Sequence, residues 1–184
     1  MLPSRPAPPV TINAPRSRVG PGNRVLKWLL IGAVTLVLLA VVAGQIGMLG
    51  GMAPDDLGLR DGKLKPPSNS PNSVSSQADL WPDHAQAGYA RVAPLALAGD
   101  GAATLARIQA IVQGMPGARV VKTEPGYLRA TFDTRLLKYT DDVEFWFDAG
   151  NGVVQVRSAS RLGRNDFGVN RARVEAIRAQ LPKG

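Results

Sequence analysis

The longest apolar stretch of the chain runs from Trp28 to Ala53, with Gln45 as its only strongly polar residue. A helix needs about 20 apolar residues to cross the hydrocarbon core of a bilayer, and this stretch supplies them. It shows no polar face at a helical period, which argues against a core helix of a soluble domain. The pattern therefore predicts a single transmembrane helix over residues 25–50.

Charges on the two sides of this stretch predict its orientation. Residues 1–27 hold five basic and no acidic residues out of a net charge of +8, whereas Asp55 and Asp56 follow the stretch. Positive charge favours the cytoplasmic side, so we expect a single-pass protein of a bacterial inner membrane with its C-terminal domain in the periplasm. The alternative is a signal peptide cleaved after Ala43, but its apolar part would exceed the usual length of about 7–15 residues.

The composition on either side of the predicted helix suggests little regular structure. Residues 1–24, rich in proline and arginine, are predicted to form a disordered cytoplasmic tail. Gly47 and Gly51 fit a small-xxx-small pattern, which predicts a homodimer through the membrane helix. Residues 51–98 are predicted to form a linker and an ordered loop. Between residues 55 and 80 the composition favours a plain linker, and a loop with a recognition role is the alternative.

Periodic structure begins near Asp100, a predicted N-cap for a helix over residues 101–113 that ends at Gly114. Alternating apolar residues then predict strands near 119–123, 127–135, 143–148 and 153–160, with a hairpin at Asn151-Gly152. A closing helix is expected from about 167 to 181, and an edge strand within 89–97. Residues 99–184 thus predict an α+β, two-layer domain, in which two helices cover one face of an antiparallel sheet of four to five strands. The other sheet face is expected to be polar or to carry a ligand.

Strand alternation also predicts which side chains share a face. Leu128, Phe145, Phe147 and Val156 are expected in the core, whereas Glu144 and Arg157 lie together on the opposite face. The remaining predicted core residues are Leu105, Ile108, Phe132, Val154 and Ile177.

Several kinds of chemistry are excluded by composition. The chain has no cysteine and a single histidine, His84, which excludes disulfides, thiolate metal sites and sites with two imidazoles. Asp141 and Asp142 are neighbours on a strand and point to opposite faces, so they are not expected to act as a pair. No catalytic residue, metal ligand or cofactor is therefore predicted. The segment 157–183 is rich in basic residues, which are expected to form a solvated helix face. Contact with anionic lipid headgroups is the alternative, and nucleic acid is not expected because little of it is available beyond the membrane.

One group of charged and polar residues stands out near the end of the domain. Two interpretations remain open for this group: arginines that recognise a carboxylate or phosphate, or a framework of salt bridges and caps, which the ordinary use of such residues favours. The framework would pair Glu144 with Arg157 and use Asp166 as a helix cap. The group consists of Asp141, Asp142, Glu144, Arg157, Arg161, Asp166, Asn170 and Arg171.

Three stretches carry a resemblance to a known family. The sequences Asp-Asp-Val-Glu-Phe at 141–145, Val-Arg-Ser-Ala-Ser-Arg-Leu-Gly at 156–163 and Asn-Asp-Phe-Gly-Val-Asn-Arg-Ala-Arg at 165–173 resemble the family named domain of unknown function 1499. The Ser-Pro-Asn-Ser-Val-Ser-Ser segment at 70–76 also fits that family, and the resemblance covers residues 58–181. It implies an envelope or membrane-linked protein of unknown activity. Relatives often carry cysteines beside Ser-Pro-Asn, but Ser73 occupies one such position here, so no thiol role carries over.

The functional hypothesis is a membrane-anchored envelope protein whose domain binds a lipid, a small molecule or a protein partner without catalysis. The alternative is an enzyme that uses carboxylate and arginine groups on an anionic substrate. A cavity on the sheet face away from the helices would help to distinguish the two.

Overall fold

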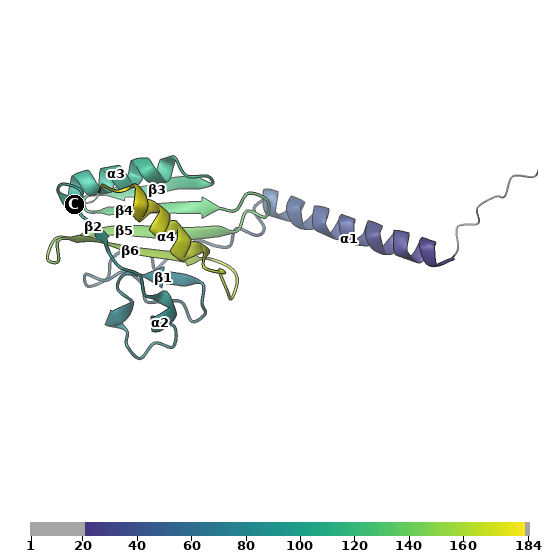
Figure 1. Ribbon diagram of the computed structural model, residues 1–184, viewed down its shortest axis with the longest axis horizontal. Helices are drawn as coiled ribbons and strands as arrows, with labels where there is room; N and C mark the ends of the chain where they lie inside the picture. Colours follow the sequence, from purple (N-terminus) through teal and green to yellow (C-terminus); the bar gives the residue numbers. More distant parts are fainter. Residues whose placement is uncertain (1–20, 183–184) are drawn as a thin grey trace, which may run out of the picture. The chain divides into compact units, whose positions relative to one another are not determined.

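The computed structural model describes residues 21–182. Contacts divide the chain into two units, residues 1–38 and residues 39–184. The helices are α1 (Pro21–Gln45), the 3-10 helix η1 (Ala78–Leu80), α2 (Ala87–Ala90), α3 (Gly101–Gln113) and α4 (Val169–Gln180). The strands are β1 (Ser73–Ser75), β2 (Leu95–Ala96), β3 (Ala118–Glu124), β4 (Tyr127–Asp133), β5 (Thr140–Asp148) and β6 (Val153–Ser160). Figure 1 shows their arrangement.

Helix α1 contains the one segment within residues 21–182 that is long and apolar enough to cross a membrane, Asn23–Gln45. A signal sequence near an N-terminus would have the same character. The helix ends at Gln45, five residues before the predicted end. Gly47 and Gly51 follow it with φ of +84° and +70°, so their small-xxx-small pattern forms no helix face and gives the predicted homodimer no support. The predicted disordered tail lies outside the described residues, except for residues 21–24, which are helical.

The predicted α+β fold is confirmed, with an antiparallel sheet in the order β1-β6-β5-β4-β3. Strand β2 pairs with the first residues of β6, beside β1 on the same edge. The predicted faces are observed: Glu144 lies opposite Arg157, and Phe145 lies opposite Leu128 on one side and Val156 on the other. Asp100 caps α3 by accepting a hydrogen bond from the backbone N–H of Ala103.

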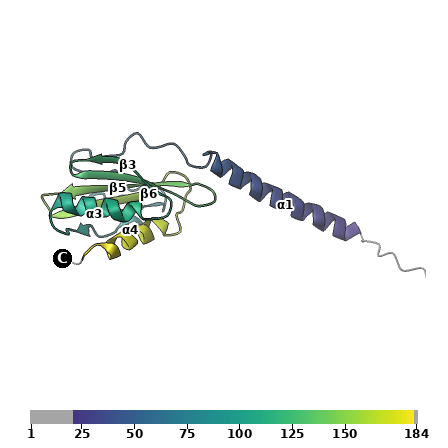
Figure 2. The ribbon, with the colours of Figure 1, turned by 90° about the horizontal axis from the view of Figure 1, so that it is seen from above.

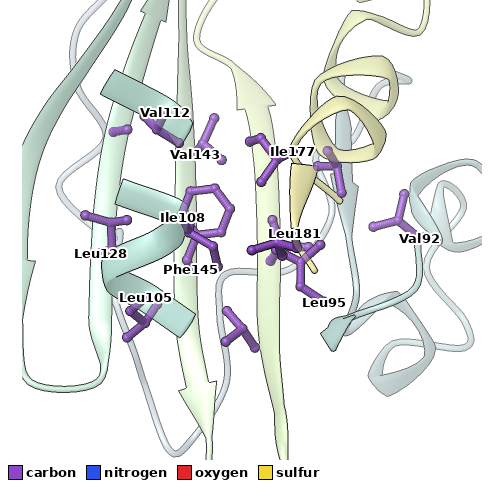
Figure 3. Packing of buried hydrophobic residues seen from close by; sticks show 14 of the residues in the cluster. Val92, Leu95, Leu105, Ile108, Val112, Leu128, Val143, Phe145, Ile177 and Leu181 are labelled. Carbon is purple, nitrogen blue, oxygen red and sulfur yellow. The ribbon is translucent and has the colours of Figure 1, made fainter. Parts of the chain in front are cut away.

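Helices α3 and α4 lie on the same side of the sheet and cover its apolar face (Figure 2). Ile108 and Val112 of α3 and Ile177 of α4 are fully buried in the same hydrophobic cluster as Phe145 (Figure 3). One residue predicted to lie in the core, Phe147, is only half-buried and lies at the edge of this cluster.

Two elements are shorter in the structure than the sequence predicts. The predicted edge strand at 89–97 is reduced to β2, because residues 87–90 form the short helix α2. The closing helix begins at Val169 and not at Phe167, because Phe167 and Gly168 have φ of +51° and +81° and cannot continue a right-handed helix.

The second face of the sheet is covered by the segment 54–77, which passes over it on the side away from α3 and α4 (Figure 2). Leu64 and Val74 of this segment are buried, and residues 73–75 form β1 along β6. This part of the chain is therefore folded into the domain, and the plain-linker interpretation of its composition is wrong here.

Gly101, the first residue of α3, is a position where a side chain would not fit. A Cβ atom there would overlap the ring of Phe147. We expect Gly101→Ala to destabilise the domain by about 1–3 kcal/mol, because overpacking forces the ring or the helix to move. The measurement is urea unfolding of the full chain in micelles. Gly88→Ala is the control, since Gly88 is helical with open space around it, and there we expect no loss.

Candidate functional site

The sheet face away from α3 and α4 carries a layer of polar side chains beneath the segment 54–77. Strand alternation places Tyr127 and Arg129 of β4, Glu144 of β5 and Arg157 of β6 on this face, where the registers bring them side by side. Glu144 and Arg157 are both buried. The polar face predicted from the sequence is thus an interior surface.

Glu144 is 0% exposed and receives two hydrogen bonds at one oxygen. Its Oε1 accepts from the Tyr127 hydroxyl and from the backbone N–H of Gly58, both at 2.7 Å. Its Oε2 has no hydrogen-bond partner and lies 3.7 Å from Nη1 of Arg157. Burial and the neighbouring carboxylate raise the pKa of Tyr127, so its hydroxyl remains protonated and donates to Glu144.

Arg157 is a buried charged group of this layer with few hydrogen-bond partners. It is 3% exposed, and its one hydrogen bond is a long one, 3.4 Å from Nη2 to the carbonyl of Pro66. Its Nε has no partner, although a guanidinium has five N–H donors. Burial lowers the pKa of Arg157 from its ordinary value, and the charge of Glu144 opposes that shift. The side chain therefore keeps unused donors in the interior of the protein.

Arg161, by contrast, is firmly paired. Its Nε and Nη2 donate to the two oxygens of Asp142 at 2.7 and 3.0 Å, a bidentate pair. The hydrogen bonds to Asp142 raise the pKa of Arg161. This pair follows the framework interpretation of the sequence.

A cavity of about 210 Å³ opens beside these residues. Asn72 lies in its wall with its Oδ1 unpartnered and its Nδ2 bonded to the carbonyl of Gly163. Donors outnumber free acceptors around the cavity, a composition that suits an oxygen-rich anion. Its polar lining is Lys65, Ser68, Asn72, Arg157, Ser160 and Arg161, beside Asp142.

Asp141 lies on the other face of the sheet, as the alternation predicts. It pairs with Arg173 of α4 at 2.5 Å, and the guanidinium of Arg173 also lies 4.5 Å from the ring centre of Phe132. Asn170 of α4 is fully buried and accepts from the Ser158 hydroxyl at 2.5 Å. These contacts fasten α4 to β5 and β6.

Asp166 and Arg171 lie away from the cavity. Burial alone would raise the pKa of Asp166, but hydrogen bonds from the Tyr89 hydroxyl and the backbone N–H groups of Gly168 and Asn170 outweigh it and lower that pKa. The N-cap position of α4 is Gly168, so the predicted cap differs in position: Asp166 lies two residues before it, accepts from N–H groups at the start of the helix, and contacts neither Arg157 nor Arg161. Arg171 donates to the carbonyls of Tyr89 and Arg91.

The eight sequence-predicted residues are thus divided between two places. Asp142, Glu144, Arg157 and Arg161 meet at the polar layer and its cavity, whereas the other four hold α4 in place. The sequence did not predict Lys65 and Asn72, because they lie in a segment without periodicity. It did not predict Tyr127 either, although strand alternation places Tyr127 on the same face as Glu144 and could have identified it. Within residues 21–182 no three His, Asp or Glu side chains gather as a metal site requires.

Comparison with known proteins identifies a family for this domain. Residues 63–181 match the family described as protein of unknown function (DUF1499). No curated protein and no solved structure matches the chain. The match includes β1 to β6, α3 and α4, and with them most of the polar layer. The chain therefore belongs to the DUF1499 family.

Proposed function

We propose that this protein is a membrane-anchored binding protein whose domain holds a small anionic group, a phosphate or a carboxylate, in the cavity beside Arg157. The anchor is α1, and the domain lies on the periplasmic side of a bacterial inner membrane. The basic Arg24 and Lys27 at the start of α1 and the acidic Asp55 and Asp56 after it support this orientation.

The observation that carries the proposal is the state of Arg157. A buried guanidinium with unused donors is costly, because each unsatisfied polar group keeps the cost of its desolvation. Glu144 is too far away, at 3.7 Å, to accept a normal hydrogen bond from it. An oxyanion in the neighbouring cavity would accept from the Arg157 guanidinium, the Lys65 ammonium and the Ser68 hydroxyl. Arg161 and Asp142 hold the wall of the cavity in place.

The test is binding of inorganic phosphate and of acetate to the full chain in uncharged micelles, measured by calorimetry and by the melting temperature. We expect one of these anions to bind and to raise the melting temperature as its concentration rises above Kd. Lys65→Gln is expected to weaken binding about tenfold, which corresponds to about 1.4 kcal/mol. Lys65 pairs with Asp56 at 2.5 Å. Lys122→Gln is the matched control, because Lys122 likewise pairs with one acidic side chain, Glu124, but lies on β3, outside the cavity.

A second variant separates the fold from the site. Arg157→Lys keeps a positive charge near Glu144 but removes the planar group of five donors, so we expect a folded protein that binds the anion poorly. If neither anion binds the full chain, or if Lys65→Gln and Arg157→Lys bind as well as the unchanged protein, the proposal is wrong.

A further inference from the structure

Two loops lie side by side at the end of the sheet where β4 and β6 finish and β5 begins. They are residues 134–139 and residues 161–168, and the backbone N–H of Arg161 donates to the carbonyl of Thr140 at 3.0 Å. We call them the end loops. Three apolar side chains project from the end loops into solvent: Leu136 is 62% exposed, Leu162 is 43% exposed and Phe167 is 92% exposed. These three exposed apolar side chains all belong to the same end of the sheet, which sets that end apart as a surface for a partner.

The backbone holds Phe167 in an unusual conformation. Its φ is +51°, which is uncommon for a bulky residue. The backbone N–H of Phe167 donates to the Asn165 side chain at 2.7 Å, and the next N–H, of Gly168, donates to Asp166 at 3.0 Å. These bonds stabilise a turn that directs an aromatic ring away from the core. Such strain is commonly found where a side chain is held for a function.

The end loops are fastened to the last turns of the apolar helix. Residues 39–45 of α1 belong to the same compact unit as the domain. The Gln45 side chain donates to the carbonyl of Leu136 at 3.0 Å, and Gly44 packs so closely on the backbone of Leu137 that a Cβ atom would overlap its carbonyl. Because the chain leaves the apolar helix at this point, the end loops lie where the helix would leave a bilayer.

Charge in the end loops suits a surface of anionic lipids. Arg135 and Arg164 are exposed and Lys138 is half-buried, whereas the one acidic residue, Asp166, is buried and bonded to Tyr89. Exposed charge in both loops is therefore entirely basic. Basic side chains around apolar ones are typical of protein surfaces that rest on anionic headgroups.

We propose that the end loops dock on the surface of the bilayer that α1 enters, with Leu136, Leu162 and Phe167 inserted among the headgroups. Docking of the end loops requires the membrane anchor of the proposed function, but it does not require the anion cavity. The domain is then held against the membrane at the end of its sheet and does not move freely about a tether. Continuity with α1 and the basic charge of the loops favour lipid over a second copy of the chain.

The absence of cysteine makes a site-specific test direct, because a single introduced cysteine takes one label. The variants Leu136→Cys and Phe167→Cys would carry an environment-sensitive fluorophore in full chain reconstituted into vesicles of phosphatidylcholine and phosphatidylglycerol. Gly150→Cys is the control, since Gly150 lies in the exposed β5–β6 turn at the opposite end of the sheet (Figure 1). We expect blue-shifted emission and quenching by spin-labelled lipids at 136 and 167, and neither effect at 150.

The outcomes separate this inference from the proposed function. Labels at 136 and 167 that emit as in water and escape lipid quenching overturn the docking, and equal quenching at 150 also overturns it. Flotation of the same vesicles after alkaline extraction tests the anchor alone: a chain that is washed off contradicts the anchor. A chain that stays while all three labels remain in water contradicts only the docking.

Discussion

Replacing Phe145 with alanine is expected to lower the free energy of unfolding by about 3–5 kcal/mol. Its ring is 0% exposed and lies at the centre of the layer between the sheet and α3, with Ile108 and Leu128 against it (Figure 3). The cavity left by the truncated ring cannot collapse, because the strands on both sides are fixed by their hydrogen bonds. A loss of this size is a large fraction of the total stability of a small domain.

The measurement is urea unfolding of the full chain in micelles, followed by circular dichroism. Phe167→Ala is the matched control, because it removes an equal ring that is 92% exposed and should change the free energy of unfolding by less than about 0.5 kcal/mol. Phe147→Ala is expected to fall between the two, since its ring is half-buried. Equal losses for Phe145 and Phe167 would contradict the burial of the Phe145 ring and the exposure of the Phe167 ring.

The central hairpins were predictable because their sequence obeys one short-range rule. In β4, β5 and β6 apolar and polar residues alternate, and Asn151-Gly152 marks the turn between β5 and β6. Since the side-chain period of a strand is two, the turn sets the register and the register decides the face. This is why the common face of Glu144 and Arg157 followed from the sequence alone.

Strand β1 was not predictable, because it is only three residues long and two of them, Ser73 and Ser75, are polar and yet buried. The Ser73 hydroxyl accepts from the backbone N–H of Ser68, and the Ser75 hydroxyl accepts from the N–H of Gln77. The Gln77 side chain in turn accepts from the N–H of Leu64. These side chains satisfy the backbone of a segment that has little regular structure, so serine and glutamine take interior positions that the sequence pattern does not mark as buried.

The candidate site was predictable only where strands carry it. Asp142, Glu144, Arg157 and Arg161 lie in or next to regular strands, so their common face follows from parity. The distances between their side chains do not follow from the sequence, because the loop that covers them comes from residues 54–68, far away along the chain. Arg171 was misplaced because its partners, the carbonyls of Tyr89 and Arg91, lie in a stretch with no readable period.

Replacing Arg157 with methionine is expected to destabilise the domain by about 3–5 kcal/mol, because it leaves the charge of Glu144 buried without a counter-ion. The two side chains are 4% and 0% exposed, so water does not screen the carboxylate. Unfolding of the full chain in urea measures the loss. A loss of less than about 1 kcal/mol would show that water reaches Glu144 in solution.

The double variant Arg157→Met/Glu144→Gln decides whether that loss comes from the unpaired charge. Glutamine keeps an oxygen that accepts from the Tyr127 hydroxyl and the N–H of Gly58, but it is neutral and leaves no buried charge without a counter-ion. We therefore expect the double variant to be more stable than Arg157→Met alone, with a coupling of about 1–3 kcal/mol between the two positions. Additive losses would mean that the 3.7 Å approach of the two groups has no energetic weight. In that case Arg157 would be held for what it binds in the cavity, and anion binding would remain the reason for a buried guanidinium at this position.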